Sequence, residues 1–316
     1  MPEFFRSFIS PIAPQLQYAL LAVFALLIIA SVTVKMLGLR YPSKDWRELK
    51  ARINTWWWIV LVFSLTLLGH KYLALSVFAL VSFLAFKEYL TLSATREADH
   101  IVLFWAYLAI PLQYFWIGIS WYGMFVLFIP VYMLLLLPMR MVLIGETKGF
   151  LKSASSLHWG LMICVFSLSH LAALLDLPGK AGEGAKLLFF LVALTQANDV
   201  AQYLWGKSIG RRKASPTVSP NKTLGGLLGG IATTTLLAWL IAPYLTPLSP
   251  LHALCAGLLI GTMGFIGDIV ISAVKRDLGV KDSGTLLPGH GGILDRLDSL
   301  TYTAPLFFHF IRYLYF

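Results

Sequence analysis

Long apolar segments recur along almost the whole chain, and the short loops between them carry most of the charged residues. A helix of about 20 apolar residues crosses the hydrocarbon core of a bilayer and satisfies its own backbone hydrogen bonds without water. About ten segments qualify by this measure. They are residues 17–35, 55–68, 73–86, 100–119, 122–139, 157–174, 185–204, 224–244, 251–274 and 299–314. We therefore expect an all-α fold, a polytopic membrane helical bundle with about ten transmembrane helices.

The span count has one open alternative. The second and third segments are short and nearly adjacent, so nine spans or a re-entrant pair would also fit. We expect one continuous membrane domain, with N-terminal transmembrane helices in residues 1–190. Residues 191–316 form a C-terminal transmembrane region that contains the polar motifs.

Composition supports the membrane class. The chain is 58% hydrophobic and only 13% charged, about half the charged fraction of a soluble domain. A net charge of +10 would suggest nucleic acid in a soluble protein, but here the basic residues lie in short loops beside apolar segments. That distribution is typical of cytoplasmic loops and of sites that handle phosphates. We expect no nucleic-acid partner.

The same loops predict the orientation. The loop after the first segment contains Arg40, Lys44, Arg47, Lys50 and Arg52, and every second loop after it is also basic. Positive loops stay in the cytoplasm. Both termini should then lie outside, which favours ten spans over nine. We expect a multi-pass protein of the cell inner (plasma) membrane, with its active site facing the cytoplasm.

Carboxylates gather at the cytoplasmic ends of the late segments. Asp199 and Asp268 lie near the ends of predicted spans, and Asp282, Asp295 and Asp298 follow on the same side. An acid at membrane depth normally faces a cavity and has a partner. Several carboxylates without a His/Cys cluster favour a hard cation such as Mg²⁺. The interleaved basic residues would clamp phosphate oxygens, as in phosphoryl and nucleotidyl transfer.

Glycines mark two further places. The run from Pro288 to Gly292 is too flexible for a helix and allows backbone amides to approach a phosphate closely. Gly225/Gly229 and Gly226/Gly230 have the small-xxx-small spacing of close helix packing, and a direct role for them stays open. Isolated acids such as Glu88 and Glu146 are interpreted as interfacial charges.

One segment resembles a known family. The 27 consecutive residues from Ser272 to Asp298 read Ser-x-Val-Lys-Arg-x-x-x-x-Lys-Asp-x-Gly-x-x-Leu-Pro-x-His-Gly-Gly-Ile-x-Asp-Arg-Leu-Asp. This pattern resembles the signature of the phosphatidate cytidylyltransferases (CDP-diacylglycerol synthases). Residues 198–223 are also similar to the family's Asp-containing helix and Ser-Pro-x-Lys-Thr loop. The sequence departs from the family at Gly225, where the family usually has Glu.

The resemblance implies an enzyme, a nucleotidyltransferase of phospholipid biosynthesis that joins CTP to phosphatidate and releases pyrophosphate. It implies Mg²⁺ as cofactor, a homodimer, and membrane lipid as the surroundings; a second cation stays open. Our candidate metal ligands are Asp268, Asp295 and Asp199. The candidate catalytic residues are Asp282, Lys275, Arg276, Lys281, His290 and Arg296. The candidate substrate-binding residues are Ser219, Lys222, Thr223, Gly291 and Gly292.

Two other functions remain as alternatives. A CTP-dependent lipid-alcohol kinase would share the nucleotide site and release CDP. A transporter or catalytically silent paralogue would use intramembrane acids and broken helices, but it leaves the contiguous run of carboxylates, Lys-Arg and glycines unexplained.

Overall fold

The computed structural model describes residues 13–43, 45–93, 96, 99–179, 182–289 and 291–316. The first half contains α2 (Pro14–Arg40), α3 (Arg47–Leu68), α4 (Lys71–Leu92), α5 (His100–Gly118), α6 (Tyr122–Leu127), η2 (Phe128–Met133), α7 (Leu134–Val142), α8 (Phe150–Leu161), η3 (Met162–Ser167) and α9 (Leu168–Leu174). The second half contains α10 (Glu183–Ile209), β1 (Lys213–Ser215), β2 (Ser219–Thr223), α11 (Leu224–Leu245), α12 (Pro250–Asp277), α13 (Leu294–Leu297) and α14 (Leu300–Tyr315).

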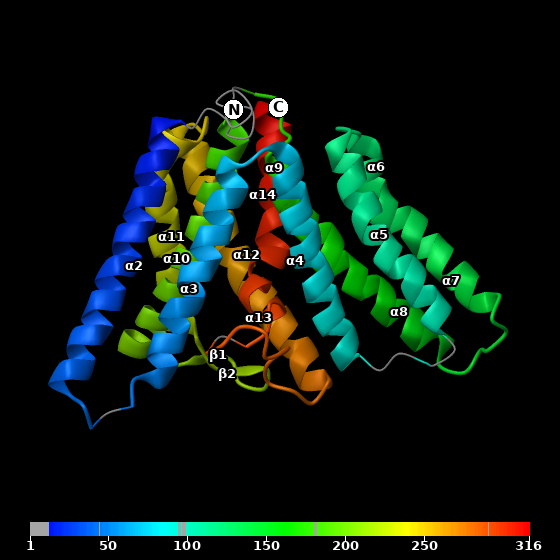
Figure 1. Cartoon of the computed structure of the whole chain (residues 1–316), viewed down its shortest axis with the longest axis horizontal. Helices are drawn as coiled ribbons and strands as arrows, with labels where there is room; N and C mark the ends of the chain where they lie inside the picture. The colour runs from blue at the N-terminus through cyan, green and yellow to red at the C-terminus, as the bar shows by residue number, and fades with distance from the viewer. Residues whose placement is uncertain (1–12, 44, 94–95, 97–98, 180–181, 290) are drawn as a thin grey trace, which may run out of the picture.

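The expected all-α membrane bundle is confirmed. Within the described residues, nine helical stretches are long and apolar enough to cross a bilayer. The tenth expected segment is α14, which has 16 residues and falls short of that length. Figure 1 shows successive stretches running up and down alternately, with the start of α2 and the end of α14 on the same side. The chain is an integral membrane protein.

Burial separates lipid-facing helices from central ones. In the most apolar part of α2 only 11% of the residues are buried, whereas the corresponding share for the stretch Phe150–Leu174 is 78%. The core around that stretch contains fully buried aromatic side chains such as Phe86, Phe190 and Phe307. Apolar side chains on α2 lie exposed, as expected where lipid replaces protein as the neighbour.

Glycines bring α10, α11 and α12 into close contact. A Cβ on Gly226 of α11 would lie 2.6 Å from the carbonyl oxygen of Gln202 on α10, and one on Gly257 of α12 would lie 2.6 Å from Cα of Thr235. These positions pack helix against helix, as small-xxx-small spacing predicts. Gly225 also lies against backbone, since a Cβ there would lie 3.2 Å from Cα of Gly210.

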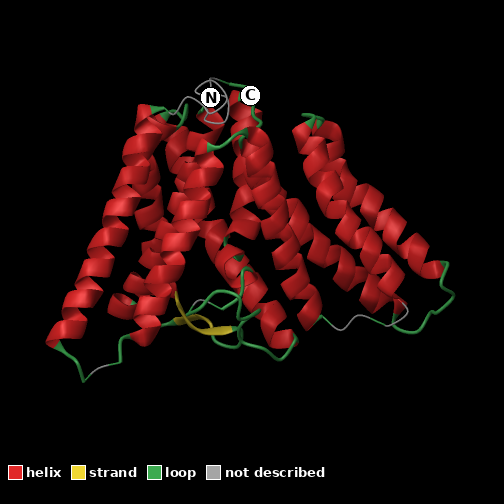
Figure 2. Ribbon diagram, viewed as in Figure 1, coloured by secondary structure: helices red, strands yellow, loops and turns green. Residues whose placement is uncertain are grey.

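One side of the bundle has the larger polar loops. Figure 2 shows the only strands drawn, the antiparallel pair β1–β2, at this lower side beside the loop that follows α12. We call residues 278–293 the signature loop. The loop begins with a turn at Gly279 (φ 73°) after α12. It is followed by the short helix α13, after which α14 returns into the bundle. The basic loops of the sequence, including the one after α2, lie on this same side (Figure 1).

Candidate active site

Three carboxylates come together where α10, α12 and the turn before α14 meet. We call Asp199, Asp268 and Asp298 the acidic cluster. Ser299 links two of them, because its hydroxyl donates to Asp199 Oδ1 (3.1 Å) and its backbone N–H donates to Asp298 Oδ1 (2.8 Å). The charges of Asp199 and Asp268 repel that of Asp298 and each other. A partly buried site of this kind attracts a cation.

Lys222 neutralises part of the negative charge of the acidic cluster. Its Nζ lies 2.5 Å from Oδ2 of Asp268, donates to Gln202 Oε1 at 3.1 Å, and stands 5.6 Å from the ring centroid of Phe265. This candidate substrate-binding residue therefore lies between α10 and α12. Thr223 caps α11 by accepting the N–H of Gly226 (3.1 Å), and Ser219 begins β2.

Asp295 has a different environment from the acidic cluster. Its Oδ1 accepts from Lys275 Nζ (2.7 Å), and its Oδ2 accepts the backbone N–H groups of Ser283 (2.8 Å) and Gly292 (2.9 Å). Burial raises the pKa of Asp295, but the charge and hydrogen bond of Lys275 and the two amides outweigh burial and lower it below its usual value. Both carboxylate oxygens are thus engaged in holding the signature loop.

The structure therefore groups the candidate metal ligands unequally. Asp268 and Asp199 lie with Asp298, whereas Asp295 binds Lys275 and the signature loop. Over the part of the chain that the structure describes, no three or more His, Cys, Asp or Glu side chains are arranged to hold a metal ion on their own. A metal at the acidic cluster would need further ligands from water or substrate.

The remaining described candidates with charged side chains are all exposed, and one of them also holds the loop. Arg276 donates to the backbone oxygens of Val218 (3.4 Å) and Val280 (3.1 Å), which ties the β1–β2 hairpin to the signature loop. Also exposed are Lys281, Asp282 and Arg296. The charge of Arg296 also acts on Asp199.

Gly291 and Gly292 lie against the carboxylate of Asp295. A Cβ on Gly291 (φ 83°) would lie 2.7 Å from Oδ2 of Asp295, and the amide of Gly292 already donates to that atom. The Gly292 amide is thus used within the loop. His290 lies outside the described residues.

Two contacts from the N-terminal helices were missed by sequence reasoning. Glu88 of α4 accepts hydrogen bonds from the backbone of Ile293 (2.9 Å) and Leu294 (3.0 Å), a role that its interpretation as an interfacial charge did not include. Thr55 of α3 donates to the carbonyl oxygen of Pro288 (2.8 Å). The only signal for Glu88 was a lone acid in an otherwise apolar helix.

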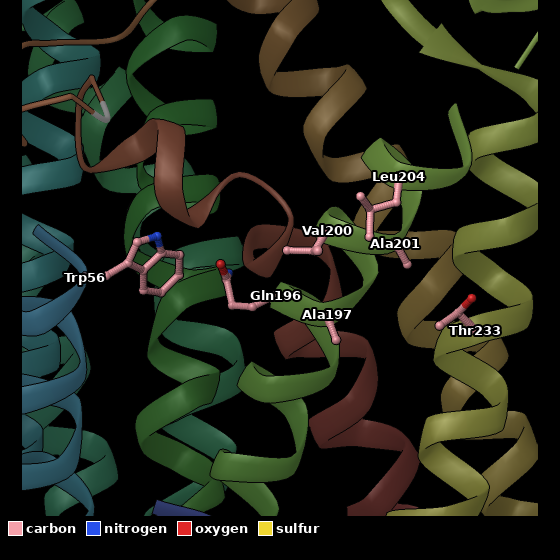
Figure 3. A pocket seen from close by; sticks show the side chains of 7 residues that line it. All are labelled: Trp56, Gln196, Ala197, Val200, Ala201, Leu204 and Thr233. Atoms are coloured by element: carbon pink, nitrogen blue, oxygen red, sulfur yellow. The ribbon is translucent and has the colours of Figure 1, made fainter. Parts of the chain in front are cut away.

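An apolar pocket of about 380 Å³ lies along α10, the helix that also carries Asp199. Figure 3 shows Trp56 of α3 opposite Gln196 of α10, with Thr233 of α11 on the other side of α10. The pocket is also lined by Ala197, Val200, Ala201 and Leu204, whereas Asp199 on the same helix is not one of its lining residues. Val200 and Leu204 are more than half exposed, which opens this side of the pocket toward lipid.

Comparison with known proteins places this site in a family. The model of the cytidylyltransferase family matches residues 50–314. The chain belongs to the cytidylyltransferase family. This cytidylyltransferase is accordingly an enzyme, a nucleotidyltransferase embedded in the membrane.

Its relatives differ in how much of the chain they match. "Uncharacterized protein YnbB" of Escherichia coli (strain K12) is 52% identical over 299 residues, 94% of this cytidylyltransferase and 99% of the relative. "Phosphatidate cytidylyltransferase" of Synechocystis sp. is 43% identical over 135 residues, 42% of this chain and 46% of the relative. The protein of that name from Bacillus subtilis is 42% identical over 135 residues, 42% of this chain and 49% of the relative.

Proposed function

We propose that this cytidylyltransferase acts on CTP and phosphatidate and makes CDP-diacylglycerol and pyrophosphate. A phosphate oxygen of phosphatidate attacks the α-phosphorus of CTP, and the bond from that phosphorus to the bridging oxygen of the β-phosphate breaks. The observation that carries the proposal is the acidic cluster, one of whose members, Asp199, stands on the helix that also lines an apolar, lipid-facing pocket. Two relatives named phosphatidate cytidylyltransferase, each aligned over less than half of its length, support the choice of lipid.

The reaction needs charge neutralisation and alignment more than a base, because the attacking phosphate is already an anion. The acidic cluster suits Mg²⁺, since that ion binds oxygen and commonly takes one or two carboxylates together with substrate phosphates and water. One or two carboxylates of the acidic cluster would hold it, with water and substrate phosphate as the other ligands. When bound, Mg²⁺ neutralises the phosphate charge that otherwise repels these carboxylates.

Basic residues and the pocket would position the two substrates. Lys281 and Arg296 are exposed, the charge of Arg296 acts on Asp199, and both side chains would contact triphosphate oxygens. The acyl chains of the lipid would lie in the pocket of Figure 3, with the phosphate at the level of Asp199. The basic side of the bundle would lie on the cytoplasmic side of the inner membrane. CTP is available in the cytoplasm. The homodimer that the family resemblance implies stays a prediction.

The test is a product analysis with purified protein in detergent, Mg²⁺, phosphatidate and α-labelled CTP. We expect labelled lipid and an equal amount of pyrophosphate, both lost in Asp268→Asn. Labelled free CDP that depends on an added lipid alcohol would contradict the proposal and indicate a kinase. Absence of turnover with phosphatidate, in protein that keeps its melting temperature, would also contradict it.

A further inference from the structure

Glu88 connects the N-terminal bundle to the signature loop. One of its carboxylate oxygens, Oε1, accepts the backbone N–H of Ile293 (2.9 Å), and the other, Oε2, accepts the N–H of Leu294 (3.0 Å) and the hydroxyl of Ser283 (3.2 Å). The two backbone donors stand at the start of α13, where helical N–H groups lack partners within the helix. One side chain from α4 therefore joins the interior of the signature loop, at Ser283, to the end of the loop where α13 begins.

Asp295 and Glu88 divide one set of loop donors between them. Ser283 donates its N–H to Asp295 and its hydroxyl to Glu88. The consecutive amides of Gly292, Ile293 and Leu294 are shared in the same way, the first bound to Asp295 and the next two to Glu88. The loop is thus folded around two carboxylates, of which Glu88 comes from a distant part of the chain.

The glycines of the loop provide a second, steric observation. A Cβ on Gly284 would lie 2.9 Å from Oε1 of Glu88 and 3.1 Å from Cδ, and the three atoms nearest to it all belong to Glu88. A Cβ on Gly292 would lie 2.5 Å from Oε2 of the same residue. Both glycines therefore leave room for the approach of Glu88.

Glu88 itself stands on a rigid support. Phe86 is 0% and Tyr89 is 5% exposed, and the Tyr89 hydroxyl binds the backbone oxygen (2.9 Å) and hydroxyl (3.0 Å) of Ser156 on α8. A carboxylate on a fixed helix can impose its position on a loop. We therefore expect the position of α4 to determine that of the loop, rather than the reverse.

We propose that Glu88 is a positioning residue for the active site. By holding Ser283 and the start of α13, it sets where Arg296 and Asp298 stand relative to Asp199 and Asp268. Glu88 acts through the loop and has no contact with substrate in this role. The inference rests on the proposed function for its activity readout, but its structural readout needs no substrate.

The structural arm is hydrogen exchange measured by mass spectrometry on the full chain in lipid nanodiscs, without substrate. In Glu88→Gln we expect peptides covering 283–294 to exchange about tenfold faster, because hydrogen bonds to a charged acceptor are lost. Peptides from α10 and α12 should keep their wild-type rates. Glu146→Gln is the matched control, since Glu146 is an exposed acid on the same side of the bundle.

The activity arm compares kcat with KM. Glu88→Gln should lower kcat about tenfold with little change in KM for CTP, and Glu88→Asp should recover part of the loss because a carboxylate remains. Wild-type exchange and wild-type kcat in Glu88→Gln would overturn the proposal. Faster exchange throughout the bundle with a parallel fall in melting temperature would also overturn it, because Glu88 would then serve general stability.

A double-mutant cycle with Gly284→Ala isolates the contact. Alone, Gly284→Ala should speed exchange in 283–294, because the new methyl group displaces the Glu88 carboxylate from its hydrogen bonds. In a Glu88→Ala background the same substitution should add almost nothing. Additive effects would contradict the contact. If wild type shows no turnover, the proposed function fails, while the exchange measurements still decide the role of Glu88.

Discussion

Two sets of carboxylates lie at the basic side of the bundle, and their surroundings are opposite. Asp295 and Glu88 are saturated with donors, namely Lys275, a hydroxyl and four backbone amides. The acidic cluster has mutual repulsion, one lysine, the two Ser299 donors and the hydroxyl of Ser272, which donates to Asp268. Asp295 and Asp298 are three residues apart, yet one builds the loop and the other faces the place where a cation would bind.

The comparison predicts the largest effect on activity at Asp298. Asp298→Asn removes one charge of the acidic cluster, so kcat/KM should fall about 100-fold or more and the Mg²⁺ requirement should rise. The melting temperature should not fall, because repulsion from Asp199 and Asp268 is relieved. Asp277→Asn, an exposed acid at the end of α12, is the matched control. Wild-type activity in Asp298→Asn would remove Asp298 from the site.

Asp295→Asn should affect stability as well as activity. Its side chain is 4% exposed and that of Lys275 is 11% exposed, and removal of one partner from a buried pair leaves an uncompensated charge. We expect a loss of about 3 kcal/mol in unfolding free energy, measured by denaturant titration in detergent micelles. A second change, Lys275→Met, should restore much of it.

The opposite outcome for Asp295 would be equally informative. If Asp295→Asn abolishes activity at unchanged stability, Asp295 is a metal ligand as the sequence analysis expected, and the contrast with Asp298 disappears.

Hydropathy predicted the helices well because the bilayer restricts what the backbone can do. Each expected segment lies on a helical stretch, including α14. The signature segment contains Asp298 of the acidic cluster, whereas Asp199 and Asp268 come from the helices before it. Which carboxylate does what could not be read from spacing, because Asp295 is engaged by backbone amides, which have no sequence signal.

Long-range partners were also beyond the sequence. Glu88 lies 205 residues before Ile293, and Thr55 lies 233 residues before Pro288. Lys222 was expected to bind substrate, and only the packing of α10 against α12 shows that it pairs with Asp268. Hydropathy specifies spans, whereas such contacts depend on how the spans pack.

The smallest effect is a pH dependence that separates Asp295 from a free carboxylate. Burial opposes ionisation of Asp295, but Lys275 and two amides still lower its pKa below the ordinary value of about 3.9. A group whose pKa is lowered by folding contributes its full stabilisation above the pKa that it has in the unfolded chain. This contribution is lost as pH falls through the lower pKa that the group has in the folded protein. The stability gap between wild type and Asp295→Asn should therefore be constant from about pH 7 to 5 and close below about pH 4.

Denaturant titrations of both proteins from neutral to acidic pH would measure this gap. Protonated Asp295 carries no charge for Lys275, so wild type at low pH should resemble Asp295→Asn. A gap that persists unchanged to the most acidic pH would mean that the Lys275 pair contributes no stability through the charge of Asp295. The distinction between a loop-building and a cation-facing carboxylate would then rest on Asp298 alone.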